Sequence, residues 1–336
     1  MYKKIVLLVV LCFLFTISCS SPNNPDNGNQ GNNGGSTPLP PTGPTEEELI
    51  AKYGIDIGLD NATIIQQIKE KLQLYFDEYK DYRIVFIGNP RSYDESLSSL
   101  IVQAVSSLQS ITEIDVDIRF INFKDNTISG GMFSGQTYNE NIFFNFIFPE
   151  NKIKTIEMMA FANLENIKHI TIPNSVTMVE KYGFGYCFQL EKLVFEEGIT
   201  TIWAGSFPIA EKLKELIIPS TVISIEDEAL MNHGLTELTI PNSVKSIGNK
   251  AFSTSITLTK LTLPASLTSI GSKAFSACGK LTTVIYYGTS PDTIKNNDAL
   301  LECNNLTTLI VPNALNEKDA RWQNFLGGNF TTVKQK

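Results

Sequence analysis

The sequence predicts an α/β protein whose second half is a solenoid with a parallel β-ladder. The first observation is a proline that recurs along the second half of the chain, and we call each of its positions a mark. Glu196 and Tyr287 take the place of proline at two marks. The full set of marks is Pro149, Pro173, Glu196, Pro219, Pro241, Pro264, Tyr287 and Pro312. Successive marks follow one another at nearly equal intervals along the chain. The second observation is a constant frame of apolar residues six, three and one positions before each mark. An aliphatic residue follows at about +6 and, in most units, an aromatic at about +11.

A period of roughly 20 to 29 residues with this frame is typical of a leucine-rich-repeat solenoid. Residues at −3 and −1 lie two apart and alternate with those at −4 and −2, as a short strand requires. Proline after the strand removes a hydrogen-bond donor and ends the pairing. We therefore expect the residues at −6, −3 and −1 to point inward, and we assign residues 142–312 to the solenoid.

Residues 46–141 predict a small α/β unit before the repeats. Thr45 with Glu48 forms a capping box that opens a short helix. Apolar residues at three- and four-residue steps predict two longer helices, over about 61–79 and 97–108. Residues 83–87 and 114–120 read as strands, the second alternating with one solvated face.

The ends of a solenoid expose apolar core and need caps. The unit at 46–141 can serve as the N-terminal cap, and the strand near residue 114 can be the first rung. Residues 122–141 are polar and glycine-rich, which predicts an inserted loop. At the other end, residues 313–336 carry charges and Trp322, which predicts a C-terminal helical cap.

The segment 1–19 reads as a targeting segment. Lys3 and Lys4 precede an unbroken run of apolar and small residues, 5–17, which is short for a membrane span. The run ends at Ser18 and Cys19, which resembles a bacterial lipobox with Cys19 as the lipidated residue, although Thr16 stands where leucine is usual. An ordinary secretory signal cut nearby and an uncleaved anchor stay open as alternatives.

Residues 20–45 are almost entirely Ser, Asn, Gly, Pro and Thr, which predicts a disordered tether. Such a segment has a root-mean-square reach of about 25–30 Å. The formal net charge of the chain is −8, which argues against nucleic acid as a main partner because phosphate contacts need clustered Lys and Arg.

The repeat motif Leu-x-x-Leu-x-Ile-Pro-x-Ser-Val-x-x-Ile-Gly-x-x-Ala-Phe resembles the BspA-like, or treponemal-type, leucine-rich-repeat family. Residues 235–253 and 258–276 match it almost letter for letter. The resemblance implies a bacterial surface protein, some of whose relatives bind host matrix or other cells. Trp203, Leu230 and Tyr286 to Gly288 depart from the motif, and the unit at 46–141 lies outside it.

The best candidate binding surface is the row of outward residues at −2 and −4 on successive strands, here called the strand ladder. Its two columns would display aliphatic residues beside mixed charges, which suits a protein ligand better than a sugar. The simpler alternative is that β-branched residues merely suit strands. The predicted ladder residues are His169, Thr171, Lys192, Val194, Glu215, Ile217, Glu237, Thr239, Lys260, Thr262, Thr283 and Ile285, followed by Thr308 and Ile310.

Cys187, Cys278 and Cys303 occupy the same slot, three positions after the aromatic one. The simpler interpretation is a small, half-buried repeat position. The alternative is a disulfide between Cys278 and Cys303, which lie in adjacent units where strand spacing suits a bridge. Cys187 is too far away to join it.

The chain offers few candidates for catalytic or metal-binding residues. His169 and His233 lie about three units apart, and no zinc, phosphate-loop or nucleophile-elbow motif is present. Asp115 and Asp117 lie on one strand face, where a solvated face is a simpler interpretation than acid–base work. The loop from Gly88 to Arg91 ends a strand ahead of a helix, where α/β units bind ligands.

Three functions follow from these observations. The first is a surface lipoprotein whose solenoid binds a protein, on host matrix or on another cell. The second is a structural envelope lipoprotein without an external ligand. The third, an exported enzyme with its site in residues 46–140, has the least support, and no cofactor is expected.

Overall fold

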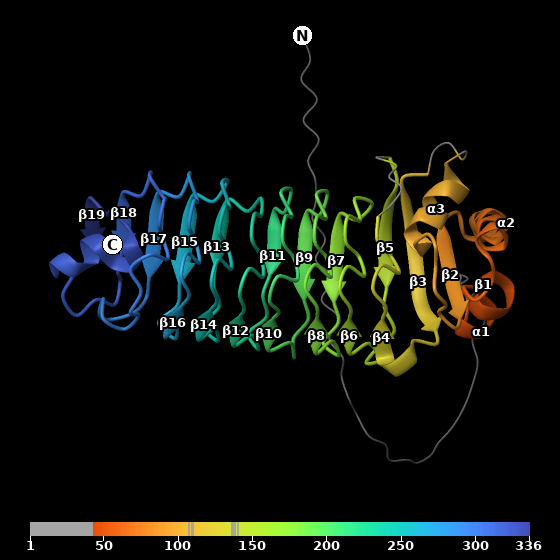
Figure 1. Ribbon diagram of the computed structural model, residues 1–336, viewed down its shortest axis with the longest axis horizontal. Helices are drawn as coiled ribbons and strands as arrows, with labels where there is room; N and C mark the ends of the chain where they lie inside the picture. Colours follow the sequence, from red (N-terminus) through yellow and green to blue (C-terminus); the bar gives the residue numbers. More distant parts are fainter. Residues whose placement is uncertain (1–42, 107, 109–110, 136–138, 140) are drawn as a thin grey trace, which may run out of the picture. The chain divides into compact units, whose positions relative to one another are not determined.

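The computed structural model describes residues 43–336 except 107, 109, 110, 136–138 and 140, and Gly43–Lys336 form one compact unit. Predictions that fall on residues 1–42 lie outside the described residues. Within this unit the chain coils repeatedly, and each turn places a strand on the same side (Figure 1). These front strands run parallel and bear the predicted ladder.

The helices and strands of the first half follow the sequence prediction closely. They are α1 (Glu46–Glu48), the π-helical turn η1 (Leu49–Tyr53), β1 (Gly54–Asp56), α2 (Asn61–Tyr79), β2 (Arg83–Gly88), α3 (Leu97–Val105) and β3 (Glu113–Ile121). The capping box of Thr45 and Glu48 is present, and Asp60 caps α2 by accepting from the Thr63 amide. The short strand β1 has no counterpart in the prediction, because so few residues give too short a pattern.

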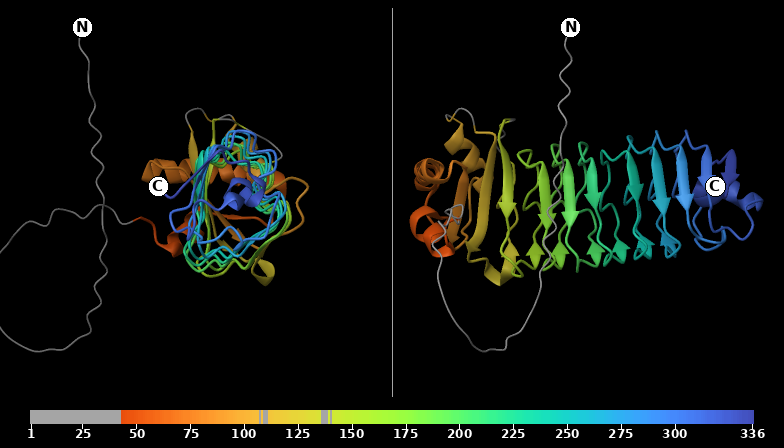
Figure 2. Two further views of the ribbon diagram at one scale, coloured as in Figure 1. Left: turned by 90° about the vertical axis from the view of Figure 1, so that its left-hand side faces the viewer. Right: turned by 180° about the vertical axis from the view of Figure 1, so that it is seen from behind.

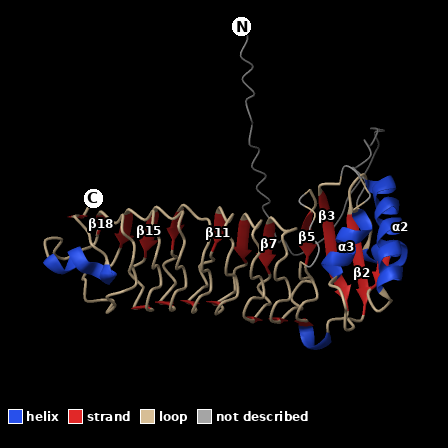
Figure 3. Ribbon diagram, turned by 45° about the horizontal axis from the view of Figure 1, so that its top comes forward, coloured by secondary structure: helices blue, strands red, loops and turns tan. Residues whose placement is uncertain are grey.

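The first strands form one parallel sheet in the order β1-β2-β3-β5, with β5 spanning Phe143–Ile147. Figure 3 shows α2 and α3 gathered beside these strands. Arg83 pairs with Asp115 of the next strand, and Asp115 pairs in turn with Asn145. The α/β unit is therefore the start of the same coil, with longer turns whose backs are helices. The strand near residue 114 is a rung, but the expectation that it is the first rung is wrong, because β1 and β2 precede β3 in the same sheet.

In the repeats each turn of the coil is shorter than in the α/β unit. The front strands are β7 (His169–Ile172), β9 (Lys192–Phe195), β11 (Glu215–Ile217), β13 (Glu237–Thr239), β15 (Lys260–Leu263), β17 (Thr283–Tyr286) and β18 (Thr308–Ile310). A second row of very short strands lies below them: β4 (Thr127–Ile128), β6 (Thr155–Ile156), β8 (Met178–Val179), β10 (Thr201–Ile202), β12 (Ser224–Ile225), β14 (Ser246–Ile247) and β16 (Ser269–Ile270). Seen end-on, the turns superimpose around a common interior (Figure 2).

Residues 122–141 are not an inserted loop, and this expectation is wrong. They contain the 3-10 turn η2 (Lys124–Asn126) and β4, and Thr127 pairs with Thr155 of the next turn. Ile128 and Phe133 are fully buried, and the Phe133 ring stacks on Phe161 with centroids 5.2 Å apart. The polar composition hid a regular turn whose few apolar residues supply the core contacts.

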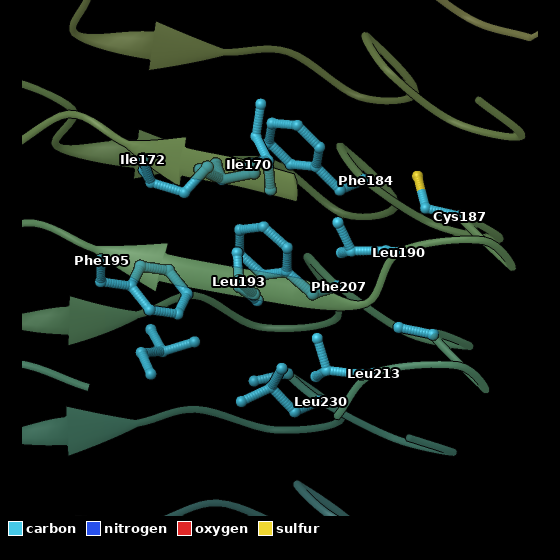
Figure 4. Close-up of a cluster of buried hydrophobic side chains, with 14 of the residues drawn as sticks. Ile170, Ile172, Phe184, Cys187, Leu190, Leu193, Phe195, Phe207, Leu213 and Leu230 are labelled. Carbon is cyan, nitrogen blue, oxygen red and sulfur yellow. The ribbon is translucent and has the colours of Figure 1, made fainter. Parts of the chain in front are cut away.

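The interior is a continuous apolar core in which each turn contributes the same positions. Figure 4 shows part of this core, with Phe184 above Phe207, while Leu230 takes the next place. Rings at the +11 position stack along the coil, from Phe133 through Phe161 and Phe184 to Phe207. Aromatic stacking adds to the burial of the rings, so this column ties each turn to the next.

The C-terminal segment closes the coil. The 3-10 helix η3 (Ala320–Gly327) carries Trp322, which is fully buried and packs against Tyr286 at 6.1 Å between ring centroids. The chain then returns as β19 (Thr332–Lys334), which pairs with β18 and was not predicted. The charged stretch therefore encloses a buried aromatic residue and is followed by one more rung.

Candidate functional site

The strand ladder has the alternation that the sequence predicts. On β7, His169 and Thr171 are exposed whereas Ile170 and Ile172 are buried. The same alternation holds from β13 to β18, where the residues at −3 and −1 are buried and those at −4 and −2 are exposed or half-buried. The outward columns therefore form a regular surface held by paired backbone.

The aliphatic residues of the −2 column are not equally exposed. Ile217 is 41% exposed, but Ile285 and Ile310, which we expected to be exposed, are half-buried. β17 and β18 have paired neighbours on both sides, whereas β11 is the last strand of the sheet β11-β9-β7. Neighbouring side chains cover an aliphatic group inside a sheet more completely than one at its end.

The ladder is interrupted between β11 and β13, which belong to different sheets. The lower strands continue past this point, since Ser224 of β12 pairs with Ser246 of β14. Leu216 and Ile218 were expected to be core residues, but they are half-buried here. Interior side chains thus become partly accessible beside the exposed Ile217.

The interruption coincides with the shortest repeat. This repeat separates Ile217 from Thr239. Within it, His233 forms an isolated parallel bridge with Ala210 of the preceding turn. At Gly234 a Cβ atom would lie 2.1 Å from the Glu211 carbonyl oxygen, so only glycine fits this close approach. The two turns are therefore joined at Ala210 and His233, which precede β11 and β13, and not along these two front strands themselves.

Charges are arranged symmetrically about the same interruption. Lys192 pairs with Glu215 at 2.8 Å on one side, and Lys260 pairs with Glu237 at 3.1 Å on the other. Such exposed pairs contribute little to stability. They do place Glu215 and Glu237 on the two strands that flank the gap, which gives this part of the ladder a polar rim.

A second interruption separates β5 from β7, which also lie in different sheets. A cleft of about 380 Å³ opens there and is lined by the predicted ladder residues His169, Thr171, Lys192 and Val194, together with Asn145, Phe146 and Ile170. A neighbouring cleft of about 470 Å³ shares Phe146 and Thr171 and adds Phe148. Phe146 and Phe148, both aromatic, are therefore half-exposed beside polar ladder residues.

The sequence did not single out Phe146 and Phe148. The available signal was the run of aromatics at positions 143, 144, 146 and 148, because the other repeats have an aliphatic residue at the place of Phe146. The Phe146 ring packs at 5.2 Å from both Phe133 and Phe161, so it fills the interior as well as the cleft wall. Nothing in the repeat pattern indicates that the strands on either side are unpaired.

The three repeat cysteines are free thiols and are buried, not half-buried. Each sulfur donates to the carbonyl of an aromatic residue in the preceding turn: Cys187 to Phe161, Cys278 to Phe252 and Cys303 to Phe275. In these three turns the slot therefore holds a small side chain that donates to the preceding turn. Burial raises the pKa of Cys187 to about 12.

Cys278 and Cys303 are in contact across adjacent turns. The neighbouring Cys303 thiol, together with burial, raises the pKa of Cys278. Buried, protonated thiols are poor nucleophiles, so Cys278 is chemically quiet while reduced. The bridge between the two cysteines stays a prediction.

The two histidines have different environments. His169 is exposed on the ladder, whereas His233 is buried in the repeat slot, where its Nδ1 accepts from the Leu235 amide. Burial lowers the pKa of His233 to about 3. In the part of the chain that the structure describes, no cluster of three His, Cys, Asp or Glu side chains is placed to hold a metal.

The solvated face expected for Asp115 and Asp117 is wrong. Asp117 is fully buried and accepts from Arg119 at 2.7 and 2.9 Å, and Asp115 accepts from Arg83 at 2.8 Å. This face of the sheet is covered by a second apolar cluster around Tyr53. Both carboxylates are held by arginines as buried or partly buried charges require, and neither is free for acid–base chemistry.

The expected lipidation residue, Cys19, lies outside the described residues. Within the described ranges, no helix combines the length and apolar character that a membrane crossing needs.

The model of the BspA type leucine rich repeat region matches this chain in six copies, over residues 126–233 and 223–324. No curated protein matches. Among solved structures, a leucine rich cell surface protein from Faecalibacterium prausnitzii A2-165 is 17% identical, with 68% of this chain and 80% of that chain covered and a TM-score of 0.37.

A leucine-rich repeat protein from Bacteroides ovatus ATCC 8483 is 22% identical, with 61% of this chain and 62% of that chain covered and a TM-score of 0.40. The leucine rich repeat protein of T. pallidum is 22% identical, with coverages of 53% and 79% and a TM-score of 0.33. The family match spans more than half of the 336 residues and runs from η2 into η3. The chain therefore belongs to the BspA-type leucine-rich-repeat family.

Proposed function

We propose that this protein is a lipid-anchored protein of the bacterial cell surface whose strand ladder binds another protein. The observation that carries the proposal is the pair of interruptions in the ladder, between β5 and β7 and between β11 and β13. At these two places interior side chains are partly exposed, whereas the ladder from β13 to β18 buries its interior completely.

The chemistry of these places suits a protein ligand. Phe146 and Phe148 at the first interruption and Ile217 at the second offer apolar anchors. Lys192 and Glu215 lie between them and supply a polar rim. Protein interfaces combine an apolar centre with such a rim, and a rigid surface loses little conformational entropy on binding.

The anchor is proposed from the N-terminal sequence. Lipidation at Cys19 with more than one acyl chain would hold the protein stably on a membrane. Residues 20–45 would then act as a tether of about 25–30 Å. The ladder could in this way reach partners beyond the membrane surface.

The second candidate is a structural lipoprotein of the cell envelope with no external ligand. The regular threonines of the C-terminal half favour it, since Thr259, Thr282 and Thr307 donate to the carbonyls of the preceding rung. These hydroxyl groups stabilise the coil from positions outside the ladder columns, and the ladder beside them carries mainly threonine and isoleucine. Digestion of intact cells with protease separates the two candidates, because an external ladder would be cleaved.

The binding proposal is tested with the mature protein against immobilised matrix and cell-surface proteins, followed by affinity measurements on Ile217→Glu. A carboxylate beside Glu215 and Glu237 should weaken binding at least tenfold, or about 1.4 kcal/mol. Ile256 is 62% exposed and lies outside the ladder, so Ile256→Glu is the matched control.

A second variant covers the other interruption. His169→Glu would place a negative charge at the cleft that Phe146 lines and should also weaken the complex. If Ile217→Glu, Thr239→Glu and His169→Glu all bind as the parent does, the ladder is not the binding surface. Equal melting temperatures of the parent and these variants show that any loss is not due to unfolding.

A further inference from the structure

A cleft of about 880 Å³ lies at the carboxyl ends of β2 and β3, away from the ladder's two interruptions. Asn89 to Tyr93 follow β2, and Asn122 and Lys124 follow β3. Ser96 and the segment 129–132 complete the wall. Parallel α/β sheets bind ligands outside the carboxyl ends of their strands. Here the strands follow one another without reversal, and the crevice is formed by the long connections that leave them.

Arg91 differs from the other arginines of the chain. Arg83, Arg119 and Arg321 each pair with at least one carboxylate. Arg91 is half-buried at the cleft and has no acidic partner among the described residues. Among the described residues, its hydrogen bonds go to neutral oxygens.

The Arg91 guanidinium is held in place by those oxygens. Its Nε donates to the Leu59 carbonyl at 2.8 Å, Nη1 to the Ser92 carbonyl at 2.8 Å and Nη2 to Asn61 Oδ1 at 2.5 Å. The group also lies 4.6 Å from the centroid of the Tyr93 ring. Three of the five guanidinium N–H groups are thus occupied, and two stay available within the described structure.

The rest of the wall is polar and lacks acidic residues. Lys124 is exposed and forms no ion pair with a described residue, and the remaining polar lining consists of amides and hydroxyls at Asn89, Asn122, Ser92, Ser96 and Ser129. Glu157 lies outside this lining, and its carboxylate accepts from the Gly130 amide. The lining itself therefore carries two positive side chains, Arg91 and Lys124, and no acidic one. The first amides of α3 are already bonded to Met132 and Ser96, so the helix end adds nothing.

We propose that this cleft binds a small anionic, hydroxyl-rich molecule, and specifically an acidic sugar. The two remaining N–H groups of Arg91 suit a carboxylate, because the guanidinium donates in a planar fork. Lys124 adds a second positive charge, while the amides of Asn89 and Asn122 and the hydroxyls of Ser92 and Ser129 can bond sugar hydroxyl groups. The volume lies within the range of about 300–1,000 Å³ that small-molecule sites occupy.

Calorimetric titration of the full chain with glucuronate, with glucose as the uncharged comparison and inorganic phosphate as the bare anion, tests the proposal. Glucuronate should bind with a dissociation constant below about 1 mM, and glucose at least tenfold more weakly. Lys124→Gln should weaken glucuronate binding about fivefold or more, and rising salt should weaken it further. Ser129→Trp, which fills the cleft without changing charge, should abolish it.

Lys245→Gln is the matched control, because Lys245 is an exposed lysine of the repeats. It should bind glucuronate as the parent does, and so should Ile217→Glu, which separates this site from the ladder. Equal binding of glucuronate and glucose, or binding unchanged in both Lys124→Gln and Ser129→Trp, would overturn the proposal. Phosphate binding tighter than glucuronate would overturn the sugar assignment.

Discussion

Phe252 and Phe275 stack face to face in adjacent turns, with ring centroids 5.2 Å apart and planes within 1° of parallel. The same column runs through Phe133, Phe161, Phe184 and Phe207 and is broken at Leu230. Leu230 belongs to the turn that begins with β11, whose front strand is unpaired with β13. The break in the ring column and the interruption of the ladder therefore fall in one repeat.

Removal of a ring from the column should destabilise the coil. Phe252 is fully buried, so Phe252→Ala should lower the free energy of unfolding by about 3–5 kcal/mol. Denaturant unfolding measures this loss. Because each turn contacts only its neighbours, the transition should also become less cooperative.

The control for this variant is Ile256→Ala, which removes an apolar side chain that is 62% exposed. Its stability should stay within about 0.5 kcal/mol of the parent. An unfolding curve for Phe252→Ala that overlays the parent curve would mean that this ring adds nothing to the core.

Acid should destabilise the protein through His233. Burial lowers its pKa from 6.5 to about 3. Between these two pH values the unfolded state binds a proton at His233 and the folded state does not. Stability from this group is therefore complete above pH 6.5 and falls as the pH drops towards 3. Between pH 7 and pH 5 the loss should be about 2 kcal/mol.

The matched variant is His233→Ser, since Ser255 fills the same slot in the next turn. Unfolding free energies of both proteins are measured at pH 7 and pH 5, and the difference between the two pH dependences isolates His233. Parallel pH dependences would show that the histidine is not buried in its neutral form.

Mild oxidation should join Cys278 to Cys303, because both buried thiols occupy the same slot in adjacent turns and each affects the pKa of the other. The bridge closes a loop of about 25 residues and should stabilise the folded state by about 3–4 kcal/mol. Alkylation and mass spectrometry of the unreduced, unfolded protein should give one linked peptide pair and a free Cys187. Alkylation of all the repeat cysteines after oxidation would exclude the bridge, and Cys278→Ser provides the unlinked reference.

Cys19→Ala should abolish lipid attachment and release the protein from membranes, because stable anchoring needs more than one acyl chain. Incorporation of labelled palmitate in cells measures the first effect, and fractionation measures the second. Ser18→Ala keeps a small residue before the cysteine and should still be lipidated. Palmitate retained by Cys19→Ala would disprove the lipobox assignment.

The repeat, its register and the residues that face inward can all be predicted from the amino-acid sequence alone. Each turn repeats the same contacts at a fixed spacing. A local pattern such as Leu238 and Ile240 on either side of Thr239 therefore predicts which side chains are buried and which are exposed. The capping box at Thr45 and the helix at Asn61–Tyr79 are equally local. The polar segment after β3 was predicted wrongly as a loop. Its two buried apolar residues, Ile128 and Phe133, are too few to form a recognisable pattern in the sequence.

The places where the ladder is interrupted, and the charges that are buried, follow only from the packing of the folded chain. Asp117 looks like a surface residue in its strand, yet an apolar cluster around Tyr53 covers that face and Arg119 neutralises the carboxylate. The unpaired strand edges at β11, beside Ile217, and at β5, beside Phe146, depend on how each turn packs against the next. Periodicity reports the contacts that all turns share, whereas a binding site arises where two particular turns depart from them, and that departure depends on packing between residues distant in sequence.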